Sequence, residues 1–188
     1  MPANPIGLLL RHRRAGHDAL VWAREDLQAP ETFSLTSPAF ADGDPMPQRY
    51  RGRLRGLNVS PPLTWSAPPV GTSELVLIVQ DPDVPIGKPA VHALSIGIDP
   101  TLHRLDENAL THPSPVDGLR HGNGPFGRRG WMGPMPPRSH GPHAYVFQLF
   151  AVDHRLDLPE RFTLEQTIEA IRGGLLARAR LDGIYEKR

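Results

Sequence analysis

The stretch Leu75-Val76-Leu77-Ile78-Val79, which leads into Asp81-Pro82-Asp83, decides the fold class of this chain. Apolar residues occupy both faces of this run, as they do in a central strand of a sheet that is covered on both sides. Two later runs, at residues 91–96 and 146–152, have the same character. We therefore predict three adjacent strands in one sheet, over residues 73–80, 90–98 and 144–152.

Titratable side chains lie inside or at one end of each predicted strand. Asp81 and Asp83 follow the first strand, His92 lies within the second, and His143 and Tyr145 open the third. Such groups are costly to bury unless they pair with one another or with a ligand, so we expect them to converge on one polar pocket. Each also has a plainer explanation: the aspartates as turn residues, the lone histidine as a satisfied core residue, and the last pair as the polar rim of a core face.

Length and composition restrict the class of protein. A chain of 188 residues with 39% hydrophobic and 22% charged residues is typical of one folded domain with a core. The formal net charge of +1 argues against a nucleic-acid partner, because such proteins usually carry a basic face. Arginines recur at residues 11–14 and 49–55, and we interpret them as solvated surface, with a phosphate-binding patch as the alternative. The chain has no cysteine, which excludes disulfides and thiolate chemistry.

The sequence also bears on location. The apolar run at residues 6–10 is too short for the core of a signal peptide, and its basic residues are on the wrong side. No apolar run approaches the length of a membrane span. We therefore expect a cytoplasmic protein.

The N-terminal region is predicted to be an appendage, residues 1–30, to a domain formed by residues 31–188. Pro5 suits the first turn of a short helix that runs to Arg13, with Asn4 as its cap. Two short strands are expected at residues 33–36 and 63–65.

Towards the C-terminus, Thr163-Leu164-Glu165-Gln166 matches a capping box that starts a helix. Apolar residues recur at helical spacing as far as Ala179, so we predict a helix over residues 164–179 that ends by Gly183, followed by a short strand at 184–185. Residues 99–129 have little periodicity and are predicted to form a long functional or mobile loop.

Several motifs occur in a specific order, and this order is more informative than any single motif. They are Asn58-Val59-Ser60-Pro61-Pro62-Leu63-Thr64-Trp65, Pro69-Val70-Gly71-Thr72-Ser73, Asp81-Pro82-Asp83-Val84-Pro85, Val91-His92, Gly122-Asn123, Phe126-Gly127, Gly130-Trp131-Met132-Gly133-Pro134-Met135-Pro136-Pro137 and His143-Ala144-Tyr145-Val146-Phe147. This series resembles the phosphatidylethanolamine-binding protein (PEBP) family, in its bacterial branch that is often labelled Raf-kinase-inhibitor-like. The resemblance covers roughly residues 33–185.

The resemblance implies a mainly β fold, in which a large antiparallel sheet packs on a smaller one, with a C-terminal helix. It also implies an anion pocket for phosphate-like or carboxylate-like head groups, and a possible role in inhibiting kinases or proteases. The pocket residues that carry over are Asp81, Asp83, His92, Pro134, Pro136, His143 and Tyr145. We add Gly133 as part of the rigid wall formed by residues 133–137, and Trp131 near the mouth.

These observations predict a non-enzymatic binding protein with no cofactor and no metal ion. His92 and His143 would donate to ligand oxygens, Tyr145 would supply an O–H donor, and Asp81 would orient an imidazole. Asp83 would accept from an amine on a zwitterionic ligand. The expected partners are a small anionic or zwitterionic ligand, such as phosphate or a phospholipid head group, and a protein kinase or protease.

Two further possibilities depend on the same residues and on the N-terminus. The histidines and aspartates could instead serve a hydrolase or a metal-dependent enzyme, although no motif names a reaction. A homodimer is also predicted, because Leu8, Leu9 and Leu10 cover more than one face of a helix.

Overall fold

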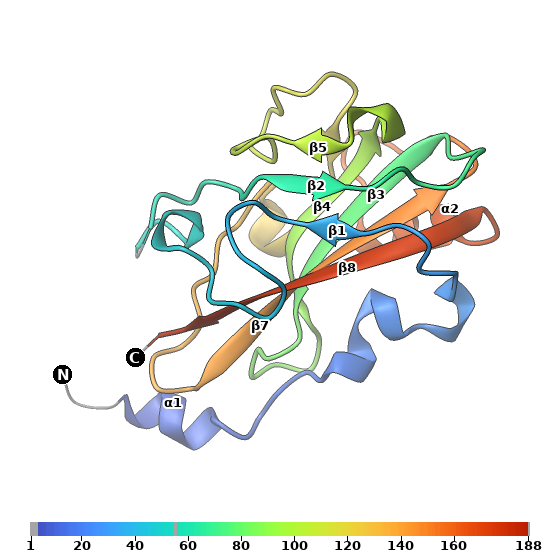
Figure 1. Ribbon diagram of the computed structural model, residues 1–188. Helices are drawn as coiled ribbons and strands as arrows, with labels where there is room; N and C mark the ends of the chain where they lie inside the picture. Colours follow the sequence, from blue (N-terminus) through green and yellow to red (C-terminus); the bar gives the residue numbers. More distant parts are fainter. Residues whose placement is uncertain (1–3, 55, 188) are drawn as a thin grey trace.

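The protein is built on an antiparallel five-stranded sheet with strand order β6-β4-β3-β7-β8 (Figure 1). The computed structural model describes residues 4–54 and 56–187. The strands of this sheet are β3 (Glu74–Asp81), β4 (Ala90–Ile98), β6 (Arg120–His121), β7 (Pro142–Val152) and β8 (Leu175–Glu186). The predicted neighbours are confirmed, since β3 pairs with β4 on one side and with β7 on the other. Every residue of β3 is buried, as expected for a strand covered on both faces.

A smaller antiparallel sheet covers one face of the large one. Its strands are β1 (Leu35–Thr36), β2 (Leu63–Trp65) and β5 (Arg104–Leu105), in the order β1-β2-β5. Their apolar side chains join one core cluster with alternate residues of β3, among them Leu75, Leu77 and Val79. The chain is therefore mainly β with two antiparallel sheets, as the resemblance implied.

The other residues of β3 point to the opposite face, because side chains alternate along a strand. Val76 and Ile78 share a second core cluster with α2 (Leu164–Ile171) and with Val21 and Leu27 of the N-terminal segment. This part of the N-terminal segment therefore lies against the sheet. The remaining short turns are η1 (His17–Ala19), η2 (Val21–Ala23), η3 (Glu25–Leu27), η4 (Gln48–Tyr50), η5 (Pro100–Leu102) and η6 (Pro125–Gly127).

The N-terminal helix α1 (Pro5–Leu10) is shorter than the predicted range, which ended at Arg13. Asn4 caps it as expected, since its side chain accepts from the Ile6 N–H at 3.0 Å. Residues 1–3 of the predicted appendage, position 55 of the arginine-rich stretch and position 188 lie outside the described residues. Within the described part of the chain, no helix is both long and apolar enough to cross a membrane.

The prediction of one helix over residues 164–179 is wrong in its second half. The capping box is present, but α2 ends at Ile171, and Gly173 follows with a φ of +82°. Strand β8 then pairs with β7 along its length. Ala177, Ala179 and Leu181 alternate inward onto the core, so pairing with a distant strand outweighs a weak local helical pattern.

Candidate functional site

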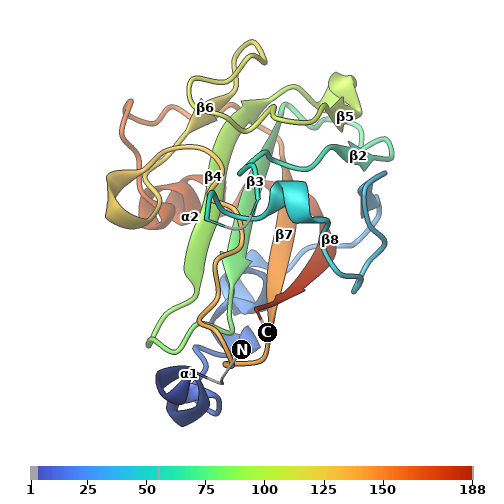
Figure 2. The same ribbon diagram turned by 90° about the vertical axis from the view of Figure 1, so that its left-hand side faces the viewer.

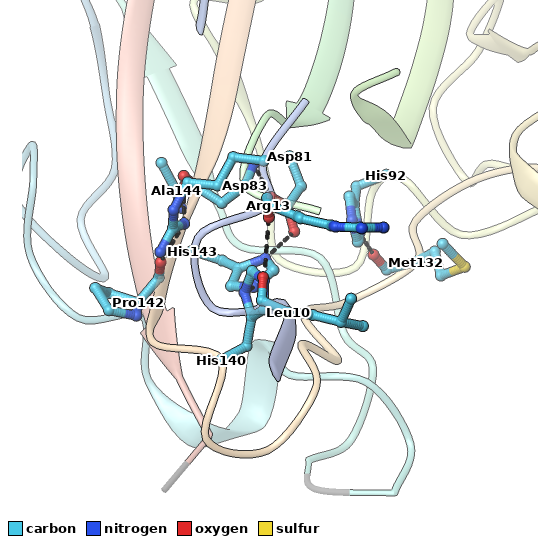
Figure 3. Close-up of polar contacts among 11 residues, drawn as sticks. Leu10, Arg13, Asp81, Asp83, His92, Met132, His140, Pro142, His143 and Ala144 are labelled. Carbon is cyan, nitrogen blue, oxygen red and sulfur yellow. Dashed lines mark hydrogen bonds and ion pairs between the residues drawn. The ribbon is translucent and has the colours of Figure 1, made fainter. Parts of the chain in front are cut away.

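Four of the predicted polar side chains lie near one another at one end of the large sheet, namely Asp81, Asp83, His92 and His143 (Figure 3). Asp81 ends β3, His92 lies near the start of β4, and His143 and Tyr145 lie near the start of β7. Because these strands are antiparallel neighbours, the end of β3 lies beside the starts of the other two. Asp83 lies in the turn that follows β3.

Asp81 is the first member of a chain of buried polar contacts. His143 Nδ1 lies 2.7 Å from Asp81 Oδ2, and His143 Nε2 lies 2.8 Å from Nδ1 of His140. His140 Nε2 lies 2.8 Å from the carbonyl oxygen of Leu10 and 3.2 Å from that of Arg13. A carbonyl oxygen only accepts, so His140 Nε2 carries a proton.

This chain of contacts engages both ring nitrogens of His143 and both ring nitrogens of His140. Both imidazoles are therefore held in place by partners within the protein.

Asp83 is neutralised by a different partner, Arg14 of the N-terminal segment. Arg14 Nη1 lies 2.5 Å from Asp83 Oδ1 and also donates to the Pro142 carbonyl at 3.0 Å. Asp83 Oδ2 accepts from the Ala144 N–H at 2.7 Å. The Asp83 N–H donates in turn to Asp81 Oδ1 at 2.8 Å, which ties the two aspartates together.

His92 differs from His140 and His143 because one of its ring nitrogens has no partner among the described residues. Its Nδ1 makes a short hydrogen bond to the Met132 carbonyl oxygen and therefore carries the proton. Nε2 has no partner among the described residues. Burial lowers the pKa of His92, with the charge of Asp81 opposing that effect. Neutral His92 therefore presents a lone pair at Nε2, and it can donate to a ligand oxygen only after it binds a proton.

Tyr145 packs directly against His92. The two rings are 4.9 Å apart and nearly perpendicular, and Tyr145 is fully buried. Its hydroxyl lies close enough to Asp81 to interact with it, but without a hydrogen bond of standard geometry. Burial, followed by the charge of Asp81, raises the pKa of this phenol well above its usual value. Tyr145 therefore remains a neutral O–H group.

Residues 133–137, the predicted wall, belong to a segment that Figure 2 shows running along β4 and β3. The Met132 N–H donates to the His92 carbonyl at 2.8 Å, so this segment is fastened to β4 just before residue 133. Gly133 donates to Asn58 Oδ1 at 2.8 Å, and Pro134 accepts from Gly52 at 3.0 Å. Gly133, Pro134 and Pro136 are buried, whereas Met135 is exposed.

The Trp131 ring is buried in the core rather than standing free at a mouth. It stacks on Phe147 at 5.7 Å, and its Nε1–H donates to the Tyr50 carbonyl at 3.2 Å. A cavity of about 500 Å³ borders this residue and is also lined by Met132, Met135 and several basic side chains, including Arg53 and Arg128. Asp81, His92 and His143 do not line that cavity, so it is separate from the histidine cluster.

A family model described as phosphatidylethanolamine-binding protein matches residues 36–186. The chain belongs to the PEBP family. A Mycobacterium tuberculosis protein named as a lipoprotein, LppC, is 39% identical over 161 residues, which cover 84% of this chain and 74% of that protein.

Two solved structures of PEBP homologues agree with this fold. CT736 from Chlamydia trachomatis superposes with a TM-score of 0.75 at 35% identity, over 83% of this chain and 98% of that one. YbcL from Escherichia coli superposes with a TM-score of 0.78 at 26% identity, over 83% of this chain and 99% of that one.

Sequence reasoning missed two residues of this PEBP site, His140 and Arg14. His140 lies three positions before His143 in His140-Gly141-Pro142-His143, and the repeated histidine around Gly-Pro was the available signal. Arg14 had no local signal, because its partner Asp83 is 69 residues away. No cluster of three or more potential metal-binding side chains occurs in the part of the PEBP chain that the structure describes.

Proposed function

We propose that this PEBP-family protein is a non-enzymatic binding protein whose site at His92 takes a small anion, such as phosphate or the carboxylate or phosphate of a head group. The observation that carries the proposal is the unpartnered Nε2 of His92, next to the Tyr145 hydroxyl and the rigid wall. Asp83 is paired with Arg14, and Asp81 is hydrogen-bonded to His143 and to the Asp83 N–H, so they repel an anion less than two free carboxylates would.

The histidine contacts favour binding over general base catalysis. His143 has Asp81 on one ring nitrogen and His140 on the other, so neither nitrogen is available to a substrate. A general base must reach the proton that it removes. A hydrolase or metal-dependent enzyme at this site would therefore depend on His92 Nε2 alone, and we favour the binding protein.

The sign of the pH dependence follows from the His92 contacts. The pKa of His92 is lowered from 6.5, so the ring is mostly neutral at pH 7 and above. Anion binding then requires that His92 takes up a proton, and affinity rises as the pH falls from 8 to 5.5. The affinity can rise by at most about tenfold per pH unit, because one proton is taken up for each anion bound.

NMR titration of the full chain with inorganic phosphate and with acetate, between pH 5.5 and 8, tests the proposal. We expect millimolar affinity, about 4 kcal/mol of binding free energy, with shifts of the His92 resonances. His92→Ala should abolish binding, whereas His12→Gln, at an exposed site, should leave it unchanged. If neither anion moves the His92 resonances at any pH, the proposal is wrong.

Regulation of a kinase or protease belongs to the same proposal. A carboxypeptidase Y inhibitor, solved in complex with its proteinase, has a TM-score of 0.51 at 17% identity and shows the fold alone. Capture of a protease or kinase by the wild type, compared with His92→Ala, would separate pocket-dependent from pocket-independent partners. The cytoplasmic location also stays a prediction, which cell fractionation tests.

A further inference from the structure

The N-terminal segment at residues 10–16, which we call the strap, contacts both halves of the site. On the aspartate side, the N–H groups of Ala15 and Gly16 donate to the carbonyls of Val84 and Pro82, at 3.0 and 2.9 Å. On the histidine side, carbonyl oxygens of the strap accept from His140 Nε2. The strap is therefore held by backbone contacts at both ends, and these contacts position the side chain between them.

That side chain is Arg14, and its guanidinium occupies the acidic part of the site. The Asp83 side chain is only 12% exposed, and its two oxygens accept from Arg14 and from the Ala144 N–H. The Arg14 guanidinium is placed further by its bond to the Pro142 carbonyl. A buried carboxylate needs a cationic or hydrogen-bonding partner, and here the protein supplies one from its own strap.

We propose that Arg14 takes the place that a ligand ammonium would otherwise occupy, so that the site selects simple anions over zwitterionic head groups. This inference deepens the proposed function and rests on it. The ligand in the family's name, phosphatidylethanolamine, carries a phosphate and an ammonium. With Asp83 already paired, the ammonium gains no carboxylate partner, and its positive charge meets that of Arg14.

The strap is then a determinant of specificity. Replacing Arg14 by a neutral side chain leaves Asp83 with the Ala144 N–H as its described partner. The uncompensated carboxylate attracts a cation, so an ammonium next to the phosphate becomes favourable. Phosphate and phosphoethanolamine share one anionic group, and the ratio of their dissociation constants reports the environment of the ammonium.

Calorimetric titration of full-length wild type, Arg14→Gln and Arg11→Gln with both ligands at pH 6 tests this. Arg11 is exposed and lies in the same strap, so it is the matched control for loss of one arginine. We expect the wild type and Arg11→Gln to bind phosphate at least as tightly as phosphoethanolamine. In Arg14→Gln, the ratio of the two dissociation constants should shift by about tenfold in favour of phosphoethanolamine, which is the effect expected from one ion pair of moderate strength.

A second variant shows whether the shift comes from Asp83 or from a loosened strap. In Arg14→Gln combined with Asp83→Asn, the carboxylate is absent and the shift should disappear. A ratio unchanged in Arg14→Gln, or a shift that persists in the double variant, overturns the role of Arg14 while leaving anion binding intact. If the wild type binds neither ligand, the proposed function itself fails and this inference fails with it.

Discussion

The contacts of His121 on β6 lead us to predict that the folded protein loses stability in acid. Its Nε2 donates to the Thr111 carbonyl at 3.0 Å, and its Nδ1 lies 2.9 Å from the Ser95 hydroxyl, which then donates to it. This arrangement suits a neutral ring, in which Nε2 donates and Nδ1 accepts. Burial lowers the pKa of His121 from 6.5 to about 4.

The magnitude follows from the difference between the two pKa values. Each pH unit between the folded and unfolded values corresponds to about 1.4 kcal/mol of unfolding free energy. Because the folded value is the lower one, the contribution of neutral His121 is fully present above pH 6.5 and is lost as the pH falls through 4. The wild type should therefore lose about 3 kcal/mol from this group alone.

Urea denaturation at pH 7 and at pH 4 measures this loss. His121→Gln keeps an amide N–H that can reach the Thr111 carbonyl but cannot bind a proton in this range. Between pH 7 and pH 4, the unfolding free energy of the wild type should fall by about 3 kcal/mol more than that of His121→Gln. His12→Gln, at an exposed residue, should behave like the wild type. Equal losses in the wild type and His121→Gln would refute the reasoning.

Three further predictions concern other contacts. Glu74 is buried and accepts from two backbone N–H groups, so Glu74→Ala should lower the unfolding free energy by about 2 kcal/mol or more in urea denaturation, with Glu74→Gln losing less. A Cβ on Gly7 would lie 1.8 Å from the Arg138 carbonyl oxygen, so Gly7→Ala should detach α1 and speed tryptic cleavage near residues 11–14; an unchanged digestion rate would contradict this. Leu9 is 80% exposed on α1, and we predict that the protein forms a dimer through this helix. A mass near 20.7 kDa for the wild type in light scattering, or a dimer that persists in Leu9→Asp, would rule this out.

Part of the site could be predicted from the sequence because the strands that carry it have strong patterns. His92 and His143 stand out against apolar runs, and a strand fixes which of its residues share a face. Their convergence with Asp81 needed only that the strands be neighbours. The chemical state of each ring could not be predicted, because it depends on partners such as the Met132 carbonyl and His140 that lie elsewhere in the sequence.

By itself, the sequence determined the three buried strands and the polar residues on them, since these follow from local patterns of apolar and titratable residues. The family followed from the resemblance of its ordered motifs to those of known members. Only the tertiary structure decided that residues 175–186 form a strand, because that depends on pairing with β7. It also decided that Arg14 pairs with Asp83 and that Nε2 of His92 has no partner among the described residues. Charge pairing and hydrogen bonding act through space between residues far apart in the chain, so local pattern does not determine which partners meet.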